Sequence, residues 1–243
     1  MLNLFASEWT KLRTTASLWW TSGLLIFLPA VVTATMAAAD TELAMAYVPL
    51  TVVMTVTLIS LVIFTVQAAM TVTTEYRFGI PATTYRLTPA RWTVGATKLV
   101  LYALIAAVLA LATLVVSFTL GDAIAYNPAD WTTNVATTRA LWALPLTAAA
   151  LVLMVQGLGW IVRNTAGAIT LAFGLQFVVE GIIGIIPRVG DTVAPYLPFS
   201  NLYAFAFDVP TAHFTVWQSL GIFVAWAAVF WAIGIVLLEK RDV

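Results

Sequence analysis

Residues 74–98 read TEYRFGIPATTYRLTPARWTVGATK and separate two long hydrophobic runs. This interruption carries one anion and four cations, which are Glu75, Arg77, Arg86, Arg91 and Lys98. Loops of membrane proteins that carry an excess of Lys and Arg stay on the cytoplasmic side. The stretch therefore predicts a cytoplasmic loop between two membrane spans.

The composition indicates a membrane protein independently of that loop. Hydrophobic residues make up 62% of the 243 residues and charged residues 9%, with a mean hydropathy of +0.98. A soluble domain has roughly 45–50% apolar and 25% charged residues. We therefore expect a lipid bilayer around the chain, and the net charge of zero gives no indication of a nucleic-acid partner.

Six hydrophobic runs are long enough to cross a bilayer, which takes about 20 apolar residues in a helix. They are residues 18–39, 44–73, 99–120, 141–162, 166–186 and 216–238. The second run is about 45 Å long as a helix, against a hydrocarbon core of about 30 Å, so we expect it to protrude into the cytoplasm. The sequence predicts an all-α, multi-pass membrane protein with six transmembrane helices in one domain, residues 1–243.

An even number of spans places both termini on one side, and the cations indicate which side. With the termini inside, two cations lie outside, Arg139 and Arg188. The nine inside are Lys11, Arg13, Arg77, Arg86, Arg91, Lys98, Arg163, Lys240 and Arg241. The positive-inside rule therefore predicts cytoplasmic termini. Residues 187–215, which are rich in proline and aromatic residues, then lie outside.

The first 16 residues predict an amphipathic helix in the membrane interface. The apolar side chains that share one face are Leu2, Phe5, Trp9 and Leu12. A second interpretation is a signal peptide, because small residues precede Asp40. The hydrophobic run is longer than the apolar region of a signal peptide, which favours the interfacial helix.

Several kinds of chemistry are excluded. The chain has no cysteine, so it has no disulfide, thiolate nucleophile or cysteine-ligated metal. None of its three lysines follows a glycine, so it has no Walker A loop for a nucleotide. The single histidine, His213, lies in an outer segment and predicts neither a metal pair nor a catalytic triad. We expect a non-catalytic chain without a metal or cofactor of its own.

Polar residues inside the spans have two interpretations each. Glu180 and Gln176, one turn apart, either line a transport pathway or form hydrogen bonds between packed helices. Thr57, Ser60 and Gln67 form a stripe on the second span that either lines a wet cavity or joins helices, and the second reading is preferred.

Small residues on the last span predict close contact with a neighbouring helix. They are Gly221 with Ala225 and Ala228 with Ala232.

Two motifs resemble a known family. Residues 8–15, EWTKLRTT, resemble the E-x-x-K-L-R-T leader of type-2 ABC transporter permeases from actinobacteria. Residues 74–79, TEYRFG, followed by TT at 83–84 and LTPAR at 87–91, resemble that family's E-Y-R-x-G-T…T…L…T-P-x-R segment. The six-span plan agrees over the whole chain, and residues 99–243 match mainly in hydropathy.

The resemblance implies a subunit of an ABC transporter in the bacterial plasma membrane. Residues 1–16 would be a connecting helix, and residues 74–98 a coupling loop whose short helix sits in a groove of a separate ATP-binding subunit. That subunit would hold ATP and Mg²⁺. Residues 187–215 would form short re-entrant helices, and a second permease chain, identical or different, would complete the transporter.

The residues that the resemblance assigns to ATPase coupling are Glu75, Tyr76, Arg77, Phe78, Gly79, Arg86, Pro89 and Arg91. Glu75 and Arg77 are expected to hold the geometry of the loop. Tyr76, Phe78 and Arg91 are expected to contact the partner. Where the family usually has Gly-Thr followed by a β-branched or charged residue, this chain has Ile80 and Pro81, and proline suits the first turn of a helix that begins near there.

The expected function is export of an amphiphilic substrate, driven by ATP hydrolysis in the partner. Replacing both Arg77 and Arg91 by alanine should then uncouple transport while the chain stays inserted. Alternatives are an ATP-independent secondary transporter, for which Glu180 is the one candidate ion site, and a non-transporting membrane scaffold. The arginines of the loop would also suit anionic lipid headgroups.

Overall fold

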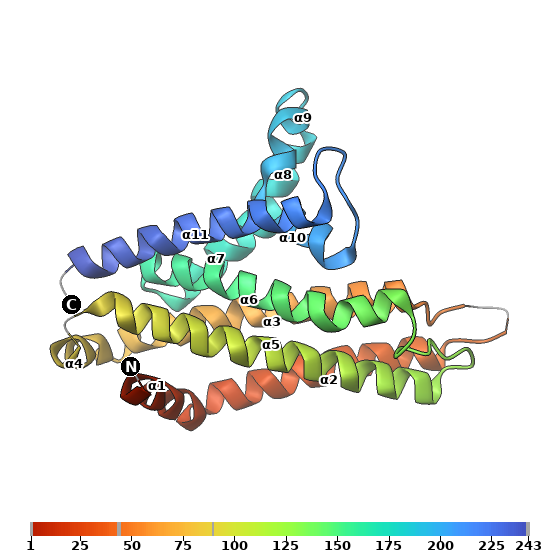
Figure 1. Ribbon diagram of the computed structural model, residues 1–243, viewed down its shortest axis with the longest axis horizontal. Coiled ribbons are helices and arrows are strands. Elements are labelled where there is room, and N and C mark those ends of the chain that lie inside the picture. Colours follow the sequence, from red (N-terminus) through yellow and green to blue (C-terminus); the bar gives the residue numbers. More distant parts are fainter. Residues whose placement is uncertain (1, 43–44, 89, 242–243) are drawn as a thin grey trace.

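The computed structural model describes residues 2–42, 45–88 and 90–241 (Figure 1). Within these ranges the chain is helical and has no strand. Six helices are long and apolar enough to span a membrane, which confirms the predicted all-α, multi-pass fold. They are α2 (Ala16–Ala38), α3 (Pro49–Arg77), α5 (Arg91–Ile124), α6 (Val135–Val162), the continuous segment Thr165–Ile185, and α11 (Val216–Lys240).

Both chain termini lie at one end of the bundle, here called the terminal end (Figure 1). Two short helices lie there as well, α1 (Leu2–Thr14) and α4 (Ile80–Leu87). The opposite, distal end carries the connections between α2 and α3 and between α5 and α6. The helices extend further toward the terminal end than hydropathy predicts, because α3 runs to Arg77 and α5 starts at Arg91.

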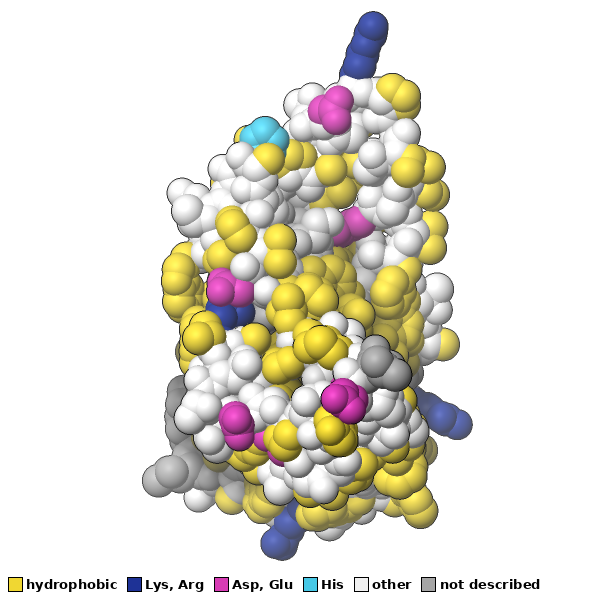
Figure 2. All heavy atoms as spheres, turned by 90° about the vertical axis from the view of Figure 1, so that its right-hand side faces the viewer, with side chains coloured by type: hydrophobic (Ala, Val, Ile, Leu, Met, Phe, Trp, Pro, Cys, Tyr) yellow, Lys and Arg dark blue, Asp and Glu magenta, His cyan; other side chains and the backbone are white. Residues whose placement is uncertain are grey.

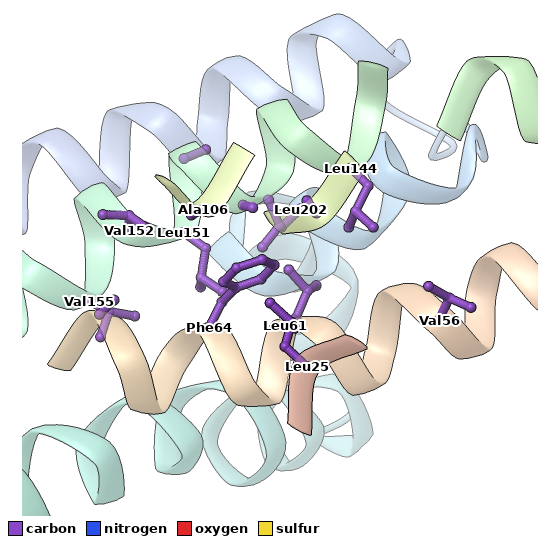
Figure 3. Packing of buried hydrophobic residues seen from close by; sticks show 14 of the residues in the cluster. Leu25, Val56, Leu61, Phe64, Ala106, Leu144, Leu151, Val152, Val155 and Leu202 are labelled. Atoms are coloured by element: carbon purple, nitrogen blue, oxygen red, sulfur yellow. The ribbon is translucent and has the colours of Figure 1, made fainter. Parts of the chain in front are cut away.

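Helix α6 is the centre of the bundle. Two thirds of its most apolar window, 67%, is buried against α3, α5 and α11. Figure 3 shows Phe64 of α3 directed toward Leu151 of α6, with Leu61 nearby. All three side chains are at most 1% exposed. The core therefore consists of aromatic and branched side chains from α3 filling the space beside α6.

Helices α6 and α11 touch along a seam of two glycines. A Cβ at Gly157 would lie 2.6 Å from the backbone nitrogen of Trp231, and one at Gly234 would lie 2.8 Å from the carbonyl oxygen of Gly157. Small residues let helix backbones approach closely in membranes. The predicted contact through Gly221, Ala225, Ala228 and Ala232 is wrong within this chain, since all four lie on the exposed face of α11.

We expect Gly157→Ala to lower the free energy of unfolding by about 1–3 kcal/mol, because overpacked helices must move apart. Gly221→Ala is the matched control, since a Cβ there meets no atom within 4 Å. It should leave stability unchanged or slightly raised. Denaturation of the purified chain in mixed micelles measures both changes. Equal changes in stability for Gly157→Ala and Gly221→Ala would contradict the close contact between α6 and α11 at Gly157.

The fifth span is a continuous helical segment whose middle part is a π-helix. It consists of α7 (Thr165–Phe173), the π-helix η1 (Gly174–Val179) and α8 (Glu180–Ile185). In Figure 1, α8 and the following α9 (Val189–Val193) project away from the bundle, and the chain then returns beside α11. The 3₁₀ turn η2 (Ala194–Tyr196) and α10 (Pro198–Phe207) follow, so residues 187–215 form short helices as predicted.

Two carboxylates accept hydrogen bonds from the loops at the distal end, which faces the viewer in Figure 2. Asp40 accepts hydrogen bonds from the N–H groups of Asn127 (2.8 Å) and Tyr47 (3.3 Å). Asp122 accepts from the Tyr47 hydroxyl (2.9 Å) and the N–H of Ala129 (3.0 Å). The bond from Asn127, with the other N–H donors, holds the pKa of Asp40 below its usual value. These contacts connect the two distal loops.

Candidate functional site

The polar stretch that opened the sequence contains a short helix at the terminal end. Helix α3 ends at Arg77, Gly79 adopts a left-handed conformation with φ +65°, and α4 begins at Ile80 with Pro81 in its first turn. Glycine reaches this conformation at no steric cost. The predicted helix start near Pro81 is confirmed.

Four charged side chains meet where α1, α3 and α5 come together at the terminal end. Lys98 of α5 contacts Glu8 of α1 (2.5 Å) and Glu75 of α3 (2.8 Å). Lys11 of α1 contacts the same two carboxylates at 2.7 and 3.0 Å. Glu8, Glu75 and Lys98 are only 1%, 6% and 5% exposed. We call these four residues the charge cluster, and its formal charges cancel.

The charge cluster fixes α1 to α3 and α5. Burial raises the pKa of Glu8, but the ammonium groups of Lys98 and Lys11 outweigh this effect and lower that pKa below its usual value. The carboxylate is therefore charged at neutral pH. Glu75, which was expected to hold the geometry of the loop, lies inside this cluster and not on a free surface.

An aromatic layer seats α4 on the bundle. Tyr85 of α4 is 7% exposed, and the Arg91 guanidinium lies 5.3 Å from its ring centroid. Tyr76 packs edge-on against Trp160 at 6.2 Å, and the Arg163 guanidinium lies 5.0 Å from the Tyr76 ring. Tyr76 is half-buried and contacts Trp160 and Arg163 within the chain, and its expected contact with a partner stays a prediction.

Arg91, whose expected contact with a partner stays a prediction, forms hydrogen bonds within the chain. Its guanidinium donates to the carbonyl oxygens of Leu238 (3.0 Å) and Arg241 (2.8 Å), at the C-terminal end of α11. In return, Glu239 accepts from the backbone N–H of Trp92 (2.8 Å) at the start of α5. Cations are favourable at helix C-termini and anions at N-termini. Arg91 thus joins α5 to α11, and its replacement would disturb the fold.

Four further coupling candidates, Arg77, Phe78, Gly79 and Arg86, are exposed together with Ile80, and these five residues define what is here called the α3–α4 knob. All five are exposed, Phe78 to 70%. The Arg77 guanidinium lies 5.8 Å from the Phe78 ring centroid. Pro89 lies outside the described residues. An aromatic side chain with basic neighbours is typical of the centre of a protein interface.

A cavity of about 540 Å³ lies beside the knob, between the α1–α2 corner and helices α3 and α4. Phe78 and Arg77 lie on its wall, the charge cluster on its floor, and Gln67 also lines it. The knob is therefore exposed on two sides, toward solvent and toward this cavity.

One residue of the polar stripe of the second span, Gln67, joins helices through hydrogen bonds. Thr57, Ser60 and Gln67 are at most 2% exposed. The Gln67 amide donates to the Thr21 hydroxyl (2.7 Å) and accepts from the Tyr102 hydroxyl (2.6 Å), which links α2, α3 and α5. This arrangement corresponds to the preferred interpretation of interhelical hydrogen bonding.

Glu180 and Gln176 hold α10 against the fifth span. Glu180 accepts from the backbone N–H of Phe199 (2.6 Å) and from the N–H (2.7 Å) and hydroxyl (2.6 Å) of Ser200. Gln176 donates to the hydroxyl of Tyr203. These contacts correspond to one of the two interpretations, hydrogen bonding between packed helices, and the pathway role stays a prediction. Both carboxylate oxygens of Glu180 are engaged at the start of α10.

Arg139 holds the other end of α10 and was not singled out from the sequence. It donates to the carbonyl oxygens of Phe205 (2.6 Å) and Ala206 (3.2 Å) and contacts Asp208 at 3.1 Å. An arginine near the start of an apolar helix was the available signal. In the part of the chain that the structure describes, no three His, Asp or Glu side chains form a group that could hold a metal.

The site is thus a basic and aromatic turn between α3 and α4, and buried charges join α3 to α1 and α5 next to it. No protein-family model matches the chain, and no curated protein matches it significantly.

Proposed function

We propose that the chain is the membrane-spanning permease subunit of an ATP-driven ABC exporter of the type-2 class. The observation that carries the proposal is the α3–α4 knob, in which an exposed Phe78 with Arg77 beside it lies at the turn from α3 into the short helix α4. Its aromatic centre and basic rim suit a groove of a separate ATP-binding subunit. ATP and Mg²⁺ would be held by that partner.

The contacts around the knob support transmission of force. Tyr85 seats α4 on the bundle, and α3 continues from the knob through 29 residues without a break. The charge cluster joins α3 to α1 and α5. Packed helices move as rigid bodies. A push on Phe78 would therefore displace these helices together and change the pathway.

The fifth span supports pairing with a second permease chain. Only 22% of its apolar window is buried within the chain. Phe177 and Ile182 are 56% and 51% exposed, and Ile185 is 79% exposed. A pathway between two such chains suits an amphiphilic substrate. The terminal end then faces the cytoplasm of a bacterial cell, and the distal end faces outward.

The test is to purify the tagged chain from its native membrane in mild detergent and identify stoichiometric partners. We expect an ATP-binding subunit, and we expect Phe78→Ala to reduce its recovery at least tenfold, as for an interface hot spot. Phe78 is a better residue to mutate in this test than Arg91, because the Phe78 side chain forms no hydrogen bond whose loss would disturb the fold. Tyr126→Ala is the matched control, an aromatic residue that is 63% exposed near the distal end.

Other outcomes would contradict the proposal. A chain that purifies without an ATPase would favour a scaffold, or a secondary transporter if transport stops with a protonophore and continues after ATP depletion. Equal loss of the partner in the Phe78 and Tyr126 variants would show that the knob is not the docking surface.

A further inference from the structure

A second cavity lies on the other side of the α1–α2 corner, where α2 packs against α5. This groove has a volume of about 340 Å³. Its apolar wall is formed by Leu18, Leu101, Leu104, Ile105, Val108 and Leu109. Leu104 and Val108 are 61% and 66% exposed, so the groove opens on the outer surface of two membrane-spanning helices. Lipid is the solvent at that surface.

The terminal end of the groove has a different chemistry. Arg13, Trp9 and Trp19 line it there. The Trp19 indole N–H donates to the carbonyl oxygen of Arg13 (2.8 Å), which fixes the ring at the corner between α1 and α2. Arg13 is exposed and forms no ion pair with any other described residue. The groove thus has a cation without an ion pair among the described residues at one end and apolar side chains along the rest of its length.

This combination matches one class of ligand. Tryptophan side chains are enriched at the depth of lipid headgroups, and a guanidinium binds phosphate oxygens in a bidentate manner. The apolar wall continues from Arg13 in the direction that an acyl chain takes into the bilayer. A zwitterionic headgroup would satisfy Arg13 less well, because its own ammonium group offsets the phosphate.

We propose that this groove is a binding site for an anionic phospholipid, with the headgroup phosphate on Arg13 and an acyl chain between α2 and α5. The lipid would also contact Trp9 and so cover the side of α1 away from the charge cluster. The proposal does not depend on the ABC assignment, because it requires only that the chain spans a membrane.

The experiment is native mass spectrometry of the purified full chain with added phosphatidylglycerol or phosphatidylcholine. Arg13→Gln should lower the preference for phosphatidylglycerol by roughly fivefold, the contribution of one interfacial cation. Arg188→Gln is the control, an exposed cation at the start of α9 outside the groove. Leu104→Trp should fill the groove and reduce binding of both lipids, whereas Leu111→Trp, 42% exposed on the same helix, should not.

The outcomes distinguish a built site from general surface charge. An unchanged lipid preference in Arg13→Gln, or an equal loss in Arg188→Gln, would overturn the proposal. Binding of both lipids that survives Leu104→Trp would show that no acyl chain occupies the groove. Excess inorganic phosphate should leave the bound lipid in place. Displacement of the lipid by phosphate would identify a site for a soluble anion and would also overturn the proposal.

Discussion

Replacing Lys98 with methionine should lower the free energy of unfolding by about 3–5 kcal/mol. The ammonium group is the buried member that joins the carboxylates of Glu8 and Glu75, at 2.5 and 2.8 Å. Without it, two charges that are almost inaccessible to solvent share Lys11 alone. Removing one partner of a buried ion pair leaves an uncompensated charge, which is far more unfavourable than losing a surface pair.

Lys11→Met is the matched control for this prediction. Its side chain is 32% exposed, and both carboxylates keep Lys98 when it is removed. We expect a loss of about 1 kcal/mol or less, as for exposed pairs. Adding Glu8→Gln and Glu75→Gln to Lys98→Met should restore much of the stability, since no charge then remains buried. Denaturation in mixed micelles measures each variant. Equal losses for the two lysines would contradict the role of burial.

The charge cluster is a part of the site that could not be predicted from the sequence. Hydropathy predicts the six spans because an apolar run of sufficient length is a local property. It places Glu75 and Lys98 in a loop because charged residues are read as solvated. The structure shows both inside continuous helices, α3 and α5, where each neutralises the other. Such pairing depends on residues far apart in sequence, and no local pattern contains it.

The orientation of a helix about its own axis is a second property that the hydropathy pattern does not predict. Residues Gly221 and Gly234 of α11 are both small and both lie in an apolar run, but only Gly234 faces α6. A helix that is apolar on all sides has no marked polar face to orient it. Which stripe packs inside is decided by the neighbouring backbone, here that of Gly157. The exposed stripe is then left for lipid or another chain.

Helix α10 leads to the second large prediction, because both of its ends are held by side chains from other helices. Glu180 binds its first N–H groups, and Arg139 binds its last carbonyl groups. Both interactions match the polarity of the helix dipole. The sequence presented Glu180 as a buried charge that required an explanation, and the two interpretations were a transport pathway and hydrogen bonding between helices. The contacts at α10 favour hydrogen bonding between helices. The two interpretations also predict different effects of Glu180 mutations on stability and on transport.

We expect Glu180→Ala to lower the free energy of unfolding by about 3 kcal/mol, because the N–H of Phe199, which is buried, and two donors of Ser200 lose their acceptor. Glu180→Gln should lower it by about 1 kcal/mol, since its amide oxygen still accepts from Phe199. A transport role predicts the reverse pattern, in which the glutamine variant keeps its stability and loses transport. Denaturation in mixed micelles and transport into vesicles, measured on both variants, separate the two roles. If the Glu180→Gln variant is stable but does not transport, Glu180 has a role in the transport pathway. If Glu180→Gln is mildly destabilised and Glu180→Ala strongly destabilised, Glu180 holds α10 in place.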